Sequence, residues 1–408
     1  MKTVYLDNNA TTRVDEKVVE AMLPYLRENY GNPSSIYDLG GTAQKAVKAA
    51  REQIRAFLGA KNASEIIFTA SGSEGANLAI KGVLANALTA PASADNVPNK
   101  KHIITTVVEH ACVLNLYKTL EKQGYEVTYI GVDSKGELDP DELRNAVRPD
   151  TALVSVMWAN NETGIIFPVE KIAQIVKAKN PDTKVFVDGV QAAGKIKMNV
   201  GESLIDLSVI SGHKFHAPKG VGALYVKKGV RIIPQIVGGH QENSKRAGTE
   251  NVPYIVGLGM AAELATQGFD KNTTEMARLR DKLEKGILKS VFNARLNSGG
   301  PNRVANTTNI GFEYVEGELI LLYLNDEGIF ASSGSACTSG DLDPSHVLKA
   351  MGVPFTSLHG SIRFSLSHYT TEAEIDYVLE KLPPVIEKIA AISPFQKELA
   401  ELKQKALV

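Results

Sequence analysis

The chain contains little cysteine and no long apolar segment. The first argues against a disulfide-rich protein and the second against a membrane-spanning one. Its two cysteines, Cys112 and Cys337, cannot form a disulfide scaffold, so we expect reduced thiols and consider each as a possible nucleophile. No apolar run approaches the roughly 18 residues of a membrane-spanning helix, and the N-terminus turns polar within a few residues. We therefore expect a cytoplasmic protein without a membrane partner.

The chain also lacks an excess of charge of either sign. Lysine and arginine total 45 and aspartate and glutamate total 46, so the formal net charge is -1. This balance gives no indication of a basic surface for nucleic acid. Because 408 residues exceed what one hydrophobic core usually serves, we expect two domains. The large domain is predicted over residues 15–255, and the small domain from residues 1–14 and 256–408.

Helical and strand patterns alternate along the predicted large domain. Residues 42–57 carry an apolar stripe at helical spacing, and seven short β-rich runs follow. Several runs are continuously apolar, as in a sheet covered on both faces. We therefore expect an α/β fold with a mainly parallel seven-stranded sheet between helices. The runs are 65–69, 103–108, 126–130, 153–158, 185–188, 207–211 and 222–226.

A different pattern begins near residue 251. A long helical region is followed by predicted strands near 307–312 and 361–366, and then by a charged helical tail. We expect a smaller α+β domain here, with the extreme N-terminus packed against it.

The first candidate site follows the first predicted strand, in Thr69-Ala-Ser-Gly-Ser-Glu74. Open α/β sheets bind ligands at the carboxyl ends of their strands. Backbone N–H groups at the start of the next helix, near Ser73, together with the Ser73 hydroxyl suit a phosphate. Ser73 would equally serve as an ordinary helix N-cap, so this turn alone does not decide the function.

A carboxylate and an amine stand at two later strand ends. Asp188 closes one strand, and Lys214 follows the next in Ser211-Gly-His-Lys214. A buried carboxylate keeps a pyridine nitrogen protonated, and a lysine of lowered pKa forms an imine with an aldehyde. Each residue alone would be an ordinary turn residue, but together they favour a pyridoxal-phosphate site, with Ser211 and His213 near the phosphate. His110, after a third strand, is placed to stack on the ring and pass protons.

Eight short motifs are spread along almost the whole chain. They are Tyr5-Leu-Asp-Asn-Asn-Ala-Thr-Thr12, Gly31-Asn-Pro-Ser-Ser35, Glu109-His110, Ser155-Val-Met-Trp-Ala-Asn-Asn-Glu-Thr-Gly164, Asp188-Gly-Val-Gln191, Ser211-Gly-His-Lys214, Arg246-Ala-Gly-Thr249 and Ser333-Gly-Ser-Ala-Cys-Thr-Ser339. In this order they resemble the cysteine desulfurases of the class V aminotransferase-like group, fold type I, and are most similar to the nitrogen-fixation type. The resemblance implies a pyridoxal 5'-phosphate enzyme that removes sulfur from L-cysteine and releases L-alanine.

The resemblance also implies roles for single residues. Lys214 is expected to hold the cofactor as an imine and to remove the substrate's Cα proton, and Cys337 to attack the substrate sulfur and carry it as a persulfide. The other expected contacts are Asp188 with the ring nitrogen, Gln191 with the ring hydroxyl, His110 stacked on the ring, Gly72, Ser73, Ser211 and His213 with the phosphate, Thr249 with the phosphate from the second subunit of a homodimer, and Asn161 and Arg363 with the substrate carboxylate, where a guanidinium fork is well suited.

The two cysteines are expected to differ. Cys337 lies among small polar residues that suit an exposed loop, from which it would deliver sulfur to an iron–sulfur scaffold or another acceptor protein. Cys112 lies between Ala111 and Val113 and is expected to be a small core residue. No metal site is expected, although Cys337 remains open as a transient iron–sulfur ligand.

Two segments depart from the family pattern. Gly75 and Ala76 replace residues with polar side chains after the phosphate turn, which predicts weaker phosphate binding. Asn243 and Ser244 stand where the family commonly has Arg-Gly, which affects expected contacts across the dimer.

Other functions stay open at this point. A selenocysteine lyase or a class V aminotransferase would keep Lys214 and Asp188, and the latter would not need Cys337. Residues 257–262 loosely match a glycine-rich nicotinamide fingerprint, although a helix is expected there. A non-enzymatic relative serving as a scaffold would hold no cofactor on Lys214.

Overall fold

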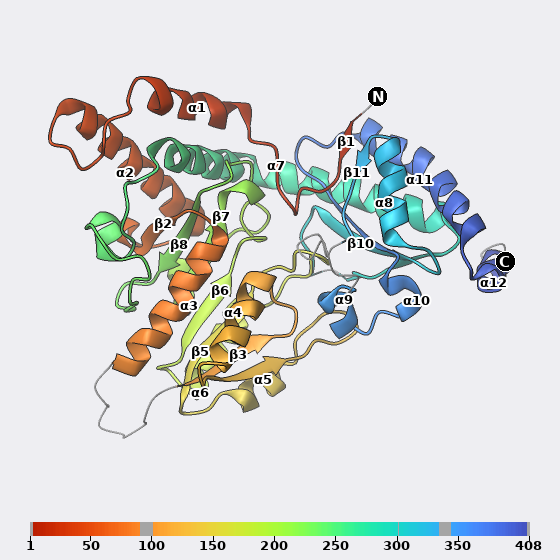
Figure 1. Ribbon diagram of the computed structural model, residues 1–408, viewed down its shortest axis with the longest axis horizontal. Coiled ribbons are helices and arrows are strands. Elements are labelled where there is room, and N and C mark those ends of the chain that lie inside the picture. The colour runs from red at the N-terminus through yellow and green to blue at the C-terminus, as the bar shows by residue number, and fades with distance from the viewer. Residues whose placement is uncertain (1–2, 90–100, 301, 334–343, 406–408) are drawn as a thin grey trace.

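A seven-stranded sheet forms the centre of the larger part of the molecule (Figure 1). The computed structural model describes residues 3–89, 101–300, 302–333 and 344–405. The strand order is β2-β8-β7-β6-β5-β3-β4, and β8 runs against its two neighbours while the other pairs are parallel. The expected α/β architecture with a mainly parallel seven-stranded sheet is therefore confirmed. The strands are β2 (Ile66–Thr69), β3 (His102–Thr106), β4 (Glu126–Ile130), β5 (Thr151–Met157), β6 (Lys184–Asp188), β7 (Leu207–Ser211) and β8 (Gly222–Val226).

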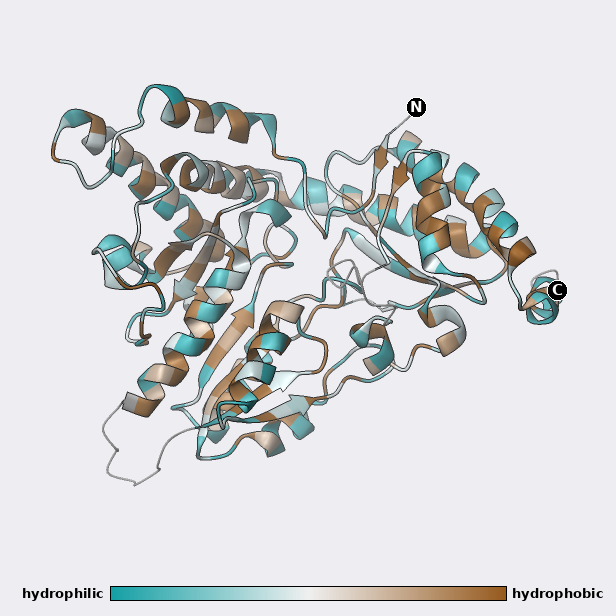
Figure 2. Ribbon diagram, in the orientation of Figure 1, coloured by the Kyte–Doolittle hydropathy of each residue, from teal (hydrophilic) through white to brown (hydrophobic). Residues whose placement is uncertain are grey.

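Apolar clusters cover both faces of this sheet. One face is covered by α3 (Gly72–Thr89) and α4 (Ala111–Glu121), and the other mainly by α2 (Asp38–Leu58) and α6 (Val169–Lys179). Strands such as β2 and β8 are largely apolar because side chains that alternate between two buried faces must all leave water. Figure 2 shows this as a hydrophobic colour along the central strands.

A second sheet lies in the C-terminal part of the chain. Strand β10 (Thr307–Phe312) pairs antiparallel with β9 (Ala294–Leu296) on one side and β12 (Ser361–Ser365) on the other. Near it, β1 (Val4–Tyr5) pairs parallel with β11 (Ile329–Phe330). Residues from β1 share an apolar cluster with α8 (Gly317–Asp326) and α11 (Glu372–Ile392), so the N-terminal strand packs into C-terminal structure.

The long helix α7 (Val252–Ser290) joins the two parts of the chain (Figure 1). It packs on α1 (Glu16–Arg27) and α2 along one stretch and on α11 along another. The glycine-rich residues 257–262 lie inside this helix, and a Cβ on Gly257 would come within 2.7 Å of Met22 Sδ. The nicotinamide interpretation is therefore wrong, because these glycines allow close helix packing and no strand precedes them.

The remaining helices are short or terminal. None of the helices in the described ranges is long and apolar enough to cross a membrane. These helices are α5 (Pro140–Ala146), α9 (His346–Ala350), α10 (Phe355–Leu358) and α12 (Gln396–Lys405).

Candidate active site

The candidate site lies at the carboxyl ends of the parallel strands, where three segments meet. Asp188 ends β6, Ser211 ends β7, and Gly72 begins α3. A Cβ placed on Gly72 would lie 3.0 Å from Val190 Cγ2 and 3.3 Å from Ser211 Cβ. The turn after β2 is therefore packed against the ends of β6 and β7, and glycine permits this close approach.

The start of α3 shows which serine caps the helix. Ser71 Oγ accepts a hydrogen bond from the Glu74 backbone N–H at 3.1 Å, so Ser71 satisfies the helix start and Ser73 is not the N-cap. Ser73 is exposed and its hydroxyl remains next to the helix N-terminus, where an anion is favoured. A Cβ on Gly75 would lie 2.5 Å from Val209 Cγ2, so this departure from the family pattern fits close packing of α3 on β7.

Asp188 and His110 lie near each other in the buried part of the site. Burial raises the pKa of Asp188, against the opposing effects of the Val190 N–H, which donates to Asp188 Oδ1 at 3.0 Å, and of nearby His110 and Lys214. Burial lowers the pKa of His110, while Asp188 acts in the opposite direction. The site thus holds a buried carboxyl group whose charge the surrounding residues do not fully compensate.

His110 also begins helix α4. Its Nδ1 accepts a hydrogen bond from the Cys112 backbone N–H at 3.2 Å, so this nitrogen carries no proton. A neutral His110 ring must then hold its proton on Nε2. The helix cap therefore selects the tautomer of the expected acid–base residue.

Lys214 lies in a short turn after β7 and reaches the N-terminal segment of the chain. Its Nζ donates to Asn9 O at 2.7 Å and to Ala10 O at 2.8 Å. His213, beside it, has its Nδ1 3.2 Å from Thr11 Oγ1, and burial lowers its pKa to about 4. The N-terminal motif that was expected only to accompany the site thus forms one of its walls.

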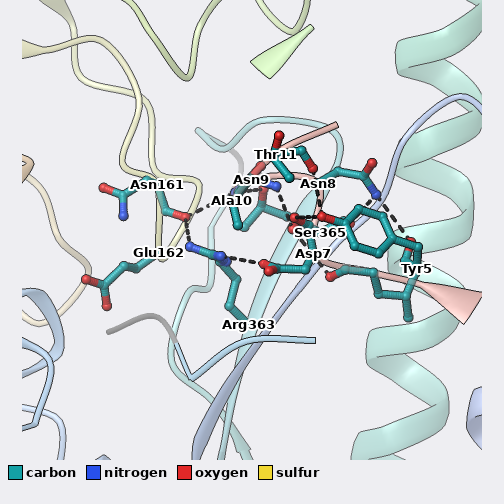
Figure 3. A network of polar contacts seen from close by, with 12 residues as sticks. Tyr5, Asp7, Asn8, Asn9, Ala10, Thr11, Asn161, Glu162, Arg363 and Ser365 are labelled. Carbon is teal, nitrogen blue, oxygen red and sulfur yellow. Dashed lines mark hydrogen bonds and ion pairs between the residues drawn. The ribbon is translucent and has the colours of Figure 1, made fainter. Parts of the chain in front are cut away.

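Asn9 connects this wall to the C-terminal sheet (Figure 3). Its backbone N–H donates to Ser365 Oγ at 2.9 Å. Its side-chain Nδ2 donates to Asn161 O at 3.1 Å and to Thr307 Oγ1 at 2.8 Å. Asn9 is 2% exposed, so each of these bonds is made away from bulk water. The position of Lys214 is therefore tied to β10, β12 and the loop after β5.

Arg363 projects from β12 into the same region and is 3% exposed (Figure 3). Its Nη2 forms an ion pair with Asp7 Oδ1 at 2.6 Å, and its Nη1 donates to Asn161 O at 3.0 Å. Its Nε is buried and has no hydrogen-bond partner among the described residues. Asn161 was expected to act through its side chain, but its contact with Arg363 is through the backbone carbonyl.

Gln191 follows Asp188 by three residues and is held on both ends of its amide. Its Nε2 donates to Asn9 O at 3.0 Å, and its Oε1 accepts from Lys195 Nζ at 2.6 Å. The side chain is 6% exposed. Gln191 and Lys214 thus share Asn9 O as an acceptor.

One expected site residue, Thr249, is not brought to this point within the chain. Thr249 is exposed and lines a separate surface hollow of about 140 Å³ with Phe68 and Arg246. Cys337 lies outside the described residues. Cys112 is at the first turn of α4, and burial raises its pKa to about 12, so its thiol stays protonated near neutral pH.

The sequence motifs gave no role to Asp7, Asn9 or Lys195, which the structure places in contact with predicted site residues. Asp7 and Asn9 belong to the motif Tyr5–Thr12, which carried no assigned role, and Lys195 stands four residues after Gln191. That four-residue spacing was the available local signal for Lys195. The contacts Asp7–Arg363 and Asn9–Ser365 each join residues 356 positions apart, so no local pattern would reveal them.

Known proteins are similar to this chain in sequence and fold over nearly their full length. Residues 4–378 match the family described as Aminotransferase class-V, whose members depend on pyridoxal phosphate. Cysteine desulfurase 2 of Trichormus variabilis is 57% identical over 404 residues, covering 99% of this chain and 98% of the relative. Cysteine desulfurase NifS of Azotobacter vinelandii is 50% identical over 395 residues, covering 97% and 95%. A solved NifS-like protein has 40% identity and a TM-score of 0.88, covering 95% of this chain and 100% of its own.

Proposed function

Because the chain belongs to the class-V aminotransferase family, we propose that it is a cysteine desulfurase of the nitrogen-fixation type. It binds pyridoxal 5'-phosphate on Lys214, takes sulfur from L-cysteine and leaves L-alanine. The sulfur passes to Cys337 and then to an iron–sulfur scaffold or another acceptor protein. The observation that carries this proposal is the meeting of Asp188, His110 and Lys214 in one site, where Lys214 lies close enough to lower the pKa of both Asp188 and His110.

The residues present fit this cofactor. Burial raises the pKa of Asp188, and a protonated pyridine nitrogen would supply the cation that this carboxylate lacks. Close packing at Gly72 brings the N-terminus of α3 beside Ser211, and the N–H groups there suit a phosphate. When bound, the cofactor supplies an electron-withdrawing ring that stabilises negative charge at the substrate Cα.

The chain's own residues supply binding and proton transfer. Arg363 has a buried Nε without a partner, and a substrate carboxylate would occupy the guanidinium more fully than Asp7 does alone. Lys214 loses its two carbonyl acceptors, Asn9 O and Ala10 O, when it turns toward the cofactor, and it then serves as the base for the Cα proton. His110 holds a transferable proton on Nε2 because Nδ1 accepts the Cys112 N–H.

The reactive thiol is assigned to Cys337 rather than to Cys112. Burial raises the pKa of Cys112 to about 12, which leaves almost no thiolate for attack on sulfur. The family motif at 333–339 supports Cys337 as the nucleophile. We also propose a homodimer in which Thr249 reaches the phosphate of the other subunit, since in one chain it lies in a different hollow from Lys214.

Product analysis tests the function directly. Protein loaded with pyridoxal phosphate is incubated with L-cysteine, and alanine and sulfur bound to Cys337 are measured by mass spectrometry. Lys214→Ala is expected to lose alanine formation, and Cys337→Ala to lose both the persulfide and turnover. Cys112→Ala is the matched control and is expected to keep both. Turnover that survives Cys337→Ala would remove the nucleophile assignment, and the absence of a borohydride-reducible link on Lys214 would remove the proposed cofactor site.

A further inference from the structure

A second lysine, Lys195, is largely buried next to the site, where it lines a cavity, and it has no role in the reaction described above. It lies in the turn after β6, where its backbone N–H donates to Ala192 O at 2.9 Å. Its Nζ donates to Gln191 Oε1 at 2.6 Å and contacts Asn9 Oδ1 at 3.3 Å. Both partners are neutral amides, and no ion pair of Lys195 with a carboxylate occurs within the described part of the chain.

Burying an amine without an opposite charge is costly, and the surroundings of Lys195 make the cost larger. Burial, followed by the positive charges of Lys214 and Arg363, lowers the pKa of Lys195 to about 7. A solvated surface position, or an apolar residue of similar length, would avoid this cost. The placement therefore points to a contact that Lys195 makes and an apolar residue would not make.

That contact decides which way the Gln191 amide faces. A protonated Lys195 only donates hydrogen bonds, so it pairs with the amide oxygen of Gln191 and not with its NH2 group. With Lys195 on one side, Gln191 Oε1 must face Lys195, and Nε2 must face Asn9 O, which accepts from it at 3.0 Å. Asn9 O is a backbone carbonyl, which only accepts hydrogen bonds, so it pairs with the amide nitrogen of Gln191 and not with its oxygen.

We propose that Lys195 is a positioning residue that holds the Gln191 amide so that its second Nε2 hydrogen is offered to the ring oxygen of the cofactor. This inference rests on the proposed function and deepens it. A donor at that oxygen favours its ionised form, whereas a flipped amide would present Oε1 and favour the protonated form. Lys195 thereby sets the electronic state of the bound cofactor without touching it.

The absorption spectrum of the bound cofactor tests this proposal, because the ionised and protonated ring oxygens absorb at long and short wavelength respectively. Lys195→Met keeps the length of the side chain but removes the donor. It is expected to shift the ratio of the two bands toward the short-wavelength form by about tenfold, the equivalent of one hydrogen bond. Lys195→Arg keeps a donor, and the adjoining cavity of about 200 Å³ gives it room, so it is expected to keep the wild-type spectrum.

Two further variants make the result specific. Gln191→Glu keeps an acceptor for Lys195 but has no N–H for the ring oxygen, so it is expected to reproduce the Lys195→Met spectrum. Lys177 is the matched control, because it is also a buried lysine of lowered pKa but bonds Asp206 and Thr183 O, away from the site. Lys177→Met is expected to lower stability and leave the band ratio unchanged.

The outcomes separate this proposal from the function on which it rests. A wild-type protein that binds no cofactor on Lys214 overturns both. If the wild type binds the cofactor and Lys195→Met shows the same ratio of the two bands, only the role of Lys195 is overturned. An equal change of the band ratio in Lys177→Met would also overturn the role of Lys195, because the change would then reflect a general destabilisation of the protein.

Discussion

The seven-stranded sheet and the three-stranded C-terminal sheet are both largely buried, but they bury different kinds of side chain. In the seven-stranded sheet, neighbouring residues such as Val185 and Phe186 belong to apolar clusters on opposite faces. In the C-terminal sheet, β12 alternates, so that Ile362 and Phe364 enter an apolar cluster while Arg363 and Ser365 form polar contacts. A sheet with two apolar faces supplies rigidity, and a sheet with one buried polar face supplies part of the site.

This difference explains why the site lies between the two sheets. The seven-stranded sheet contributes groups only where its strands end, as at Asp188 and Ser211. The C-terminal sheet contributes groups from within its strands, as at Thr307 and Arg363, because its polar face is turned toward Asn9 and Asn161. Buried polar groups are tolerated on that face since they bond one another.

The largest effect is expected from a cavity in the apolar sheet. Phe186 is fully buried in β6, and Phe186→Ala is expected to lower the free energy of unfolding by about 3–5 kcal/mol. The folded fraction should keep its affinity for cysteine, since the polar face is untouched. Urea unfolding followed by steady-state kinetics measures both. A rise in KM with little loss of stability would contradict the division of roles between the sheets.

The next effect is a pH dependence of stability caused by the buried side chain of Glu109. Burial raises the pKa of Glu109 to about 8, and its Oε2 has no hydrogen-bond partner among the residues described. Between the usual value of 4.5 and about 8 the folded state keeps a proton that the unfolded state releases. Stability therefore falls as pH rises through this window, by up to about 1.4 kcal/mol for each pH unit.

Glu109→Gln removes this titration and keeps an oxygen for the Thr106 hydroxyl and the Met157 N–H. The free energy of unfolding of the variant, measured in urea across the same pH range, is expected to change less steeply than that of the wild type. Parallel curves for the two proteins would show that Glu109 does not remain protonated in the folded state.

A smaller effect, on substrate binding, is expected when the polar face keeps the positive charge at position 363 but loses the planar guanidinium. Arg363→Lys retains a cation for Asp7 but cannot also donate to Asn161 O in the same planar arrangement. We expect KM for L-cysteine to rise about tenfold, equivalent to about 1.4 kcal/mol, with a smaller change in kcat. If kcat falls and KM stays constant, Arg363 does not bind the ground-state substrate.

The smallest effect, on stability, is expected from a change on β10, which has one polar and one apolar face. Thr308 lies on β10 and its hydroxyl donates to Glu284 at 2.7 Å, on the side away from Arg363. Thr308→Val is expected to cost about 1 kcal/mol of stability and to leave the kinetics unchanged. Altered KM in this variant would show that the two faces of the C-terminal sheet are not independent.

The sequence predicted the fold more fully than the site. Strands such as 126–130, 207–211 and 222–226 were predicted with the bounds that the structure gives, because continuous apolar runs flanked by turns are local signals. The approach of Asp188 to Lys214 followed from the rule that parallel strand ends share one edge. Family membership, expected from the motifs, is confirmed by the comparisons.

The remaining part of the site depends on contacts that no local pattern encodes. Asp7 meets Arg363, and Asn9 meets Ser365, across 356 residues of chain. Lys195 looked like one more surface lysine because sequence does not show burial. Thr249 and Cys337 stay predictions, the first because it concerns a second subunit and the second because it lies outside the described ranges.

Helix α7 acts as a long lever arm between the two sheets. Its 39 residues span about 58 Å at 1.5 Å per residue, so a tilt of about 3° about its middle would move each end by about 1.5 Å. The hydrogen bonds of Asn9 fall between 2.7 and 3.3 Å and would not survive such a displacement. The hydrogen bonds of Asn9 therefore oppose any tilt of α7. The alignment of the substrate-binding and cofactor-binding groups depends on these bonds more than on the helix.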